Sequence, residues 1–276
     1  MTLQDLENTE PWEWPRGAGR KLQEVLRDPK SPASDKTTAA ELAGNLVVMD
    51  DQMAEVLLGF VRGVDQPAEL RARAAISLGP ALEAADTEDA GDGDWADVPI
   101  SEEMYGRIKE TLRQVYEDTS APKEVRRRVL EASVRSPDDW HENAVRAAYS
   151  SDDEEWKLTA AFCMRWIPDF EEEILKLLDS PNSEIRYEAI LAAGEHEVGA
   201  AWPKVRSFLK PPSKDKRLLL AAIEASATIR PEEAQTILAG FVESRDEEIA
   251  EAAEDALAMA EGFSDDSDED EEDEEE

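Results

Sequence analysis

Apolar residues recur along this chain with the spacing of amphipathic helices, and the alternation typical of β-strands is nearly absent. Helical segments of two kinds alternate, with breakers such as Ser180-Pro181 and Arg230-Pro231 in the turns between them. The first kind is predicted at 52–62, 104–117, 171–178, 201–209 and 232–242. The pattern therefore predicts an all-α chain that is built from two-helix hairpins.

The second helices of these hairpins resemble one another in sequence. Each begins with polar or acidic residues, continues with an apolar anchor that a base usually follows, and ends in small apolar residues. The anchors are Leu70, Val125, Trp156, Ile185, Arg217 and Ile249. Four of the five separations between them are 29 to 32 residues, and the fifth, of 55 residues, contains an insertion. A fixed period of this length predicts stacked hairpins, because a single hairpin cannot bury both of its faces.

The stacking also predicts which side chains form the core. We expect the small and apolar residues that follow each anchor to face the neighbouring repeats. They are Ala189, Ile190 and Ala193 in one copy, and Ala74, Ala75 and Leu78 in another.

The stretch 174–194 resembles the HEAT repeat, especially the short type found in phycobilisome-lyase-like proteins. It contains an apolar helix, an acidic turn, the pair Ile185-Arg186, spaced alanines and a closing Gly194. The resemblance covers residues 36–262 and is weakest near 213–228, where Arg217 takes the usual apolar position. It implies a right-handed α-solenoid of about six to seven two-helix repeats, which we place at 21–263.

The family pattern also implies a groove that is lined by the second helices. Partner segments lie along such grooves in stacked arrays. The exposed candidates for partner binding are the residues beside the anchors, namely Arg71, Arg126, Trp156, Lys157 and Arg186.

The two ends of the chain fall outside the repeats. Residues 1–20 form an N-terminal segment in which Trp12 and Trp14 lie between two prolines. One interpretation is a cap that packs on the first hairpin, and the other is an aromatic hook for a partner. Residues 264–276 are almost entirely acidic, so they offer no apolar area to offset chain entropy, and we expect a disordered tail.

The charge of the chain limits its partners. The sequence holds 66 acidic and 30 basic residues, a formal net charge of −36, and only 11 of the acids lie in 265–276. Such a surface repels nucleic acid and anionic membranes and attracts basic partners. With one cysteine, no secretory signal and no apolar run long enough to span a bilayer, we expect a cytoplasmic protein.

An insertion at about 85–100 is rich in Gly and Asp. Its carboxylates at Asp92, Asp94 and Asp97 are of a type that binds calcium, but they do not follow EF-hand spacing. A solvated loop is the simpler interpretation. Trp95 is an apolar ring amid these charges, and such rings usually dock on something.

Few residues suggest catalysis. His141 lies near a predicted helix start and His196 at a bend, and their spacing does not suit zinc. Cys163 falls at a core position of the repeat, so we expect an inert, buried thiol. Arg126, Arg127 and Arg128 form the densest basic cluster, which is either a solvated helix face or a site that neutralises acids of the repeats or of the tail. We assign no catalytic, cofactor-binding or metal-binding residue.

Three functions are compatible with these sequence features. The leading hypothesis is a non-catalytic scaffold that binds another protein, possibly a basic one, along the solenoid groove. The second is an acidic chaperone or nucleic-acid mimic whose tail screens basic clients. The third is an enzyme of the bilin lyase type, with a site that the sequence does not reveal.

Overall fold

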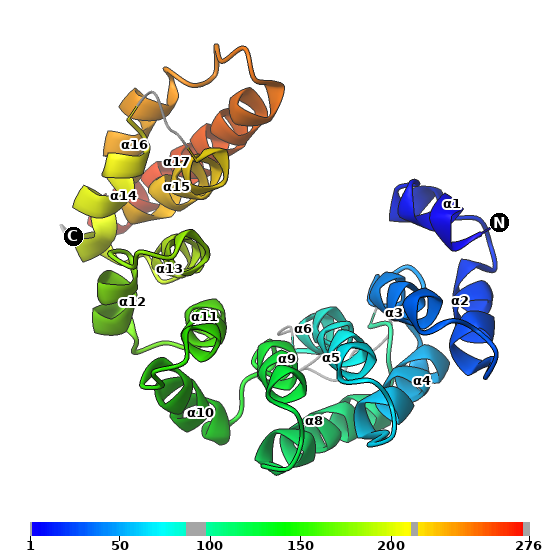
Figure 1. Ribbon diagram of the computed structural model, residues 1–276. Coiled ribbons are helices and arrows are strands. Elements are labelled where there is room, and N and C mark those ends of the chain that lie inside the picture. The colour runs from blue at the N-terminus through cyan, green and yellow to red at the C-terminus, as the bar shows by residue number, and fades with distance from the viewer. Residues whose placement is uncertain (1, 87–97, 211–214, 273–276) are drawn as a thin grey trace. The chain divides into compact units, whose positions relative to one another are not determined.

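The computed structural model describes residues 2–86, 98–210 and 215–272, and it describes side chains as far as Gly262. Within these ranges the chain forms helices, turns and bends and contains no β-strand (Figure 1). The all-α prediction is confirmed. The chain divides into two compact units, Met1–Ala144 and Val145–Glu276, and the boundary falls inside one helix.

The first unit begins with two short elements, α1 (Leu3–Glu7) and the 3₁₀ turn η1 (Pro11–Glu13). Its longer helices are α2 (Ala18–Arg27), α3 (Ala33–Leu42), α4 (Asp51–Arg62), α5 (Ala68–Ile76), α6 (Gly79–Ala85), α8 (Glu102–Glu117) and α9 (Lys123–Ser133). Helix α10 (Asp139–Tyr149) crosses the boundary between the units. The pattern of the sequence predicted α4 and α8 to within two residues, but it did not predict α6.

The second unit repeats the same plan. Its helices are α11 (Glu154–Cys163), α12 (Glu171–Leu177), α13 (Ser183–Glu195), the 3₁₀ turn η2 (Gly199–Ala201), α14 (Trp202–Phe208), α15 (Lys216–Ile229), α16 (Pro231–Leu238) and α17 (Glu247–Glu272). The tail prediction for 264–276 concerns residues beyond the last side chain that the structure describes.

Each unit has two layers. In the first, α3, α5 and α9 pack side by side, and each pairs with α2, α4 or α8 of the other layer. In the second, α11, α13, α15 and α17 pack in succession, and α12, α14 and α16 cover them (Figure 1). We call α3, α5, α9, α11, α13, α15 and α17 the second helices. The predicted core faces are confirmed, because Ala74, Ala75, Leu78, Ala189, Ile190 and Ala193 are fully buried.

The anchors hold each second helix in place through a shared position. Leu70, Val125 and Ile185 are the third residue after the N-cap of their helices and are buried. In α15 the N-cap is Asp215, whose carboxylate accepts a hydrogen bond from the N–H of Leu218. The prediction of Arg217 as the anchor is therefore wrong by one residue. Leu218 is the buried anchor, and Arg217 forms an ion pair with Glu184 and covers the Tyr187 ring.

The arginines that follow three anchors bind inside their own repeats. The Nε of Arg71 donates to the carbonyl of Val61 (3.1 Å), and that of Arg126 to the carbonyl of Tyr116 (2.8 Å). Arg186 donates to the carbonyl of Ser180 (2.7 Å). These carbonyls lie at or near the C-terminal ends of the preceding helices, where a positive charge is favourable.

The expectation that all of these bases are exposed is therefore wrong. Arg71 is only 4% exposed, and Arg126 and Arg186 are half-buried because they reach back into their own turns. Trp156 and Lys157 of α11 are half-buried as well. The role of these five residues in partner binding stays a prediction.

The two tryptophans of the N-terminal segment differ. The indole N–H of Trp14 points to the carbonyls of Thr9 (2.9 Å) and Leu6 (3.1 Å), so this side chain ties η1 to α1. Trp12 is 76% exposed. The contacts of Trp14 thus agree with the interpretation of this segment as a cap. The exposure of Trp12 is compatible with the interpretation as an aromatic hook for a partner. The loop carboxylates Asp92, Asp94 and Asp97, like Trp95, lie outside the described residues.

Candidate functional site

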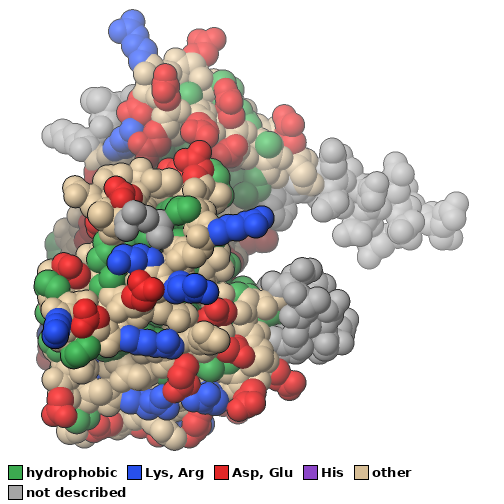
Figure 2. Space-filling model, turned by 90° about the vertical axis from the view of Figure 1, so that its right-hand side faces the viewer, with side chains coloured by type: hydrophobic (Ala, Val, Ile, Leu, Met, Phe, Trp, Pro, Cys, Tyr) green, Lys and Arg blue, Asp and Glu red, His purple; other side chains and the backbone are tan. Residues whose placement is uncertain are grey.

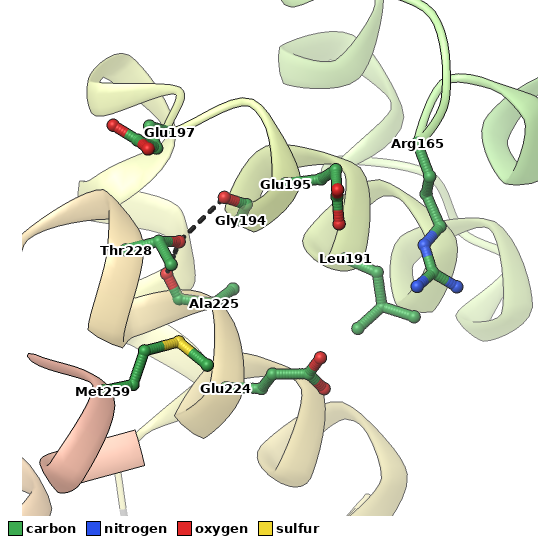
Figure 3. A pocket seen from close by; sticks show the side chains of 9 residues that line it. All are labelled: Arg165, Leu191, Gly194, Glu195, Glu197, Glu224, Ala225, Thr228 and Met259. Carbon is green, nitrogen blue, oxygen red and sulfur yellow. Dashed lines mark hydrogen bonds between the residues drawn. The ribbon is translucent and has the colours of Figure 1, made fainter. Parts of the chain in front are cut away.

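A cavity of about 340 Å³ opens between α13 and α15 in the second unit. Its apolar lining comes from Leu191 on α13, Ala225 on α15 and Met259 on α17. The carboxylates of Glu195 and Glu224 point toward the space beside Leu191, and the Arg165 guanidinium lies across from them (Figure 3). Glu197 lies at the edge of the cavity, with its side chain turned outward (Figure 3).

A second cavity of about 440 Å³ adjoins the first, between α15 and α17. The two share Glu224 and Met259. Met259 is 45% exposed although it is a large apolar side chain. The second cavity adds apolar Leu220, Ala252 and Ala256, and acidic Glu248, Glu251 and Asp255. We call the two cavities together the α13–α15–α17 groove; it has an apolar floor and an acidic rim.

A close approach of two helices forms the end of the groove at Gly194. A Cβ atom at Gly194 would lie 2.9 Å from the Cα of Ala225, so only glycine allows this contact. The Thr228 hydroxyl donates to the Gly194 carbonyl (2.7 Å; Figure 3). Just beyond, Glu197 ends α13 with φ at +48°, in the left-handed region. The closing glycine of the repeat therefore fixes the depth of the groove.

Most acids of the groove have no cation of their own, whereas several other acids of the same unit do. Elsewhere Glu173 pairs with Arg146, Asp179 with Lys204, and Asp246 with Lys216. The ion pair with Lys216 lowers the pKa of Asp246. Within the described part of the unit, no ion pair involves the rim residues Glu195, Glu197, Glu224, Glu251 and Asp255. Glu248, also on the rim, bonds Lys216.

Other surfaces of the protein mix the two signs of charge. Figure 2 shows a face on which Lys and Arg side chains lie among Asp and Glu side chains. Mixed pairs of this kind neutralise each other locally and contribute little to stability. In the α13–α15–α17 groove, several carboxylates without an ion pair line the same two adjoining cavities.

A polar cluster in the first unit is the other concentration of reactive groups. The Tyr105 hydroxyl donates to Asp86 (2.8 Å), and the Ser136 hydroxyl donates to the same oxygen (2.7 Å). Lys109 donates to Ser136 (3.0 Å) and pairs with Asp138 (3.0 Å). Burial raises the pKa of Tyr105, so the phenol keeps its proton and acts as a donor. The cluster connects the C-terminal end of α6 and helix α8 to the turn before α10. We therefore interpret it as a structural contact.

The remaining candidates from the sequence lie apart from the groove or serve as packing. Cys163 is fully buried, as predicted. The Nε2 of His196 donates to the Met164 carbonyl (2.7 Å). His141 is 1% exposed; its Nδ1 accepts from the Asp138 N–H (2.8 Å), and its Nε2 faces the Ser133 hydroxyl (3.0 Å).

The basic cluster of α9 is not a uniformly solvated face. Arg127 is 6% exposed, and both Arg127 and Arg128 lie against the buried carboxylate of Glu131. These arginines therefore neutralise an acid of their own repeat. Among the residues that the structure describes, no three His, Cys, Asp or Glu side chains are grouped to hold a metal ion. In the same residues, no helix is long and apolar enough to cross a bilayer.

The sequence did not predict the groove residues, because they lie at different positions of the second helices from the candidates for partner binding. Leu191 and Glu224 are both the ninth residue after the N-cap, and Asp255 lies nine residues after Asp246. On the second helices, the predicted candidates Arg71, Arg126, Lys157 and Arg186 lie at the fourth position, and Trp156 lies at the third. A comparison of the ninth positions would have shown that they share a face.

The match to a family model agrees with this repeated geometry. Residues 171–258, from the start of α12 into α17, match the model for HEAT repeats. This segment of the second unit therefore consists of HEAT repeats. The matched segment includes α13, α15 and the part of α17 up to residue 258, so Met259 lies just beyond it. The layered α-solenoid continues the same arrangement through the rest of the second unit.

Solved structures show distant similarity to the chain. YibA of Escherichia coli is 17% identical with a TM-score of 0.44, over 90% of this chain and 84% of that one. Human deoxyhypusine hydroxylase in complex with glycerol is 17% identical with a TM-score of 0.41, over 94% of this chain and 88% of that one. Kap121p is 13% identical with a TM-score of 0.45, over 94% of this chain and 31% of that one. No curated protein matches the sequence.

Proposed function

We propose that this HEAT-repeat protein is a non-catalytic interaction module that binds a segment of another protein in the α13–α15–α17 groove. The observation that carries the proposal is the pair of adjoining cavities across three successive second helices, with a shared, half-exposed Met259 at their junction. Exposed apolar area in a concave site favours association, because binding removes that area from water.

The composition of the groove suits a peptide. Methionine is flexible and polarizable, and it adapts to partners of different shape. The apolar floor supplies affinity, whereas the acidic rim supplies orientation and repels acidic competitors. Because the rim is negative, the proposal favours a basic protein as partner and disfavours nucleic acid.

Photo-crosslinking tests this proposal directly. A photoreactive phenylalanine analogue replaces Met259 in the full-length chain, and in a matched protein it replaces Ser207, which is exposed on α14 in the other layer. We expect one protein to crosslink reproducibly from position 259 and not from position 207. Equal crosslinking from both positions, or none from position 259, would contradict the proposal.

Substitution of Met259 by a charged residue gives a second test. Met259→Lys removes the apolar contact and introduces a charge, whereas Ser207→Lys introduces the same charge on the other layer. We expect the partner found by crosslinking to be retained on immobilised wild-type and Ser207→Lys protein and to be lost from Met259→Lys protein. Circular dichroism of all three proteins checks that the helices are intact.

A further inference from the structure

The cavity between α13 and α15 has the features of a site for one long, positively charged side chain. Leu191, Ala225 and Met259 offer apolar contacts. Glu195 and Glu224 direct carboxylates to the space beside Leu191 (Figure 3). Lysine and arginine have the matching construction, with an apolar stem and a charged head.

The charge balance of the lining favours a cation. The lining holds one base, Arg165, and three acids, of which Glu195 and Glu224 direct their carboxylates into the cavity, so the total stays negative. Neither Glu195 nor Glu224 forms an ion pair in the described part of the chain.

The size of the cavity agrees with a side chain. A volume of about 340 Å³ is at the lower end of the roughly 300–1,000 Å³ found for small-molecule pockets. The adjoining cavity, lined by Leu220, Ala252 and Ala256, gives room for an apolar neighbour of that side chain. A segment with a basic residue next to an apolar one thus fits both parts of the groove.

We propose that the cavity between α13 and α15 binds a lysine or arginine side chain of the partner protein. The stem of that side chain lies on Leu191 and Met259, and its head lies between Glu195 and Glu224. This inference rests on the proposed function, because it names the chemistry of the segment that occupies the same groove. The adjoining cavity takes an apolar side chain of the same segment.

Short peptides test the inference on the full-length protein. The probes are acetyl-Leu-Lys-Leu-amide, the same peptide with arginine, and the same peptide with norleucine, which keeps a four-carbon stem but has no charge. The readout is the NMR signal of the Met259 methyl group in protein labelled at its methionine methyl groups, and the Met259→Leu variant assigns that signal.

We expect the lysine and arginine peptides to shift the Met259 signal with a Kd about fivefold lower than that of the norleucine peptide, because two exposed ion pairs contribute about 1 kcal/mol together. Raising the salt concentration should reduce this difference. The double variant E195Q/E224Q should abolish it. The matched double variant E171Q/E232Q, on exposed positions of α12 and α16, should leave it unchanged.

Two outcomes would overturn the inference. If the norleucine peptide binds as tightly as the lysine and arginine peptides, the cavity does not recognise a cation, although the groove still binds apolar segments. If no peptide shifts the Met259 signal, the cavity does not take such a side chain. Crosslinking from position 259 decides the proposed function separately, since it does not depend on the charge of the partner.

Discussion

The two units of this protein have the same layered construction but use their charged side chains differently. In the first unit, Arg71, Arg127 and Glu131 are buried, and each contacts groups of its own repeat. In the described part of the second unit, the buried polar side chains are only Thr159 and Ser226, and the charged side chains are half-buried or exposed. Among these described residues, five acids of the groove form no ion pair.

This difference separates two roles of charge. A buried charge that is paired within a repeat fixes the position of its own helix, because an unpaired one is costly in the interior. An exposed acid without a partner contributes little to folding and keeps its electrostatic field for association. The buried charges of the first unit therefore act on the fold, and the unpaired acids of the α13–α15–α17 groove are available for binding.

Core substitutions should affect the two units alike, and they have the largest expected effect. Ile190→Asp in α13 and Val129→Asp in α9 each place a carboxylate at a fully buried position. We expect each to lower the free energy of unfolding by about 4 kcal/mol. Chemical denaturation followed by circular dichroism measures this loss. A negligible effect at only one of the positions would show that the cores are not equivalent.

Removal of an acid should distinguish the units. Glu131 is 3% exposed and pairs with Arg127 and Arg128, so Glu131→Ala should cost about 3 kcal/mol of stability. Glu224 is exposed in the groove, and Glu224→Ala should change stability by less than about 0.5 kcal/mol. Urea denaturation of both variants at neutral pH compares them. Similar losses in the two variants would contradict the assignment of separate roles.

The buried histidine of the first unit should make stability depend on pH. Burial lowers the pKa of His141 from 6.5 to about 4. The unfolded chain binds the proton first as the pH falls, so stability that is complete above pH 6.5 is lost between pH 6.5 and about 4. Protonation also removes the acceptor that Nδ1 presents to the Asp138 N–H.

We expect wild type to lose about 2.5 kcal/mol more than His141→Asn when the pH falls from 7 to 4.5. Denaturation curves of both proteins at both pH values give this difference, in which the titration of the many carboxylates cancels. Equal losses in the two proteins would show that His141 is accessible to protons in the folded state.

Much of the fold follows from local signals in the sequence. The polar N-caps Asn182 and Asp215 mark helix starts, and the period of about 31 residues gives the stacking. The cluster of Asp86, Tyr105 and Ser136 could not be predicted, because its members lie up to 50 residues apart and share no motif.

The groove escaped prediction for a different physical reason. Its equivalent positions carry unlike residues, such as Leu191 and Glu224, because each repeat supplies a different part of one binding surface. The arginines beside the anchors are repeated more regularly, but that regularity reflects their bonds to the turn, as Arg71 and Arg186 show. In this array, a repeat position that carries the same residue type in several helices has a structural role. A repeat position whose residue type differs from helix to helix lines the groove.

Glycine substitutions have small expected effects, of opposite signs at different positions. A Cβ at Gly194 would lie 2.9 Å from Ala225, and a Cβ at Gly44 would lie 3.0 Å from Ser77, so both units bring adjacent second helices together at a glycine. Gly59 in α4 has no atom near that position. We expect Gly194→Ala and Gly44→Ala to destabilise the protein by about 1 kcal/mol through overpacking, and Gly59→Ala to stabilise it by a similar amount through helix propensity. Thermal unfolding of the three variants measures these changes in stability. A stabilising effect of Gly194→Ala would show that α13 and α15 can move apart. In that case the contact between Gly194 and Ala225 would not fix the depth of the groove.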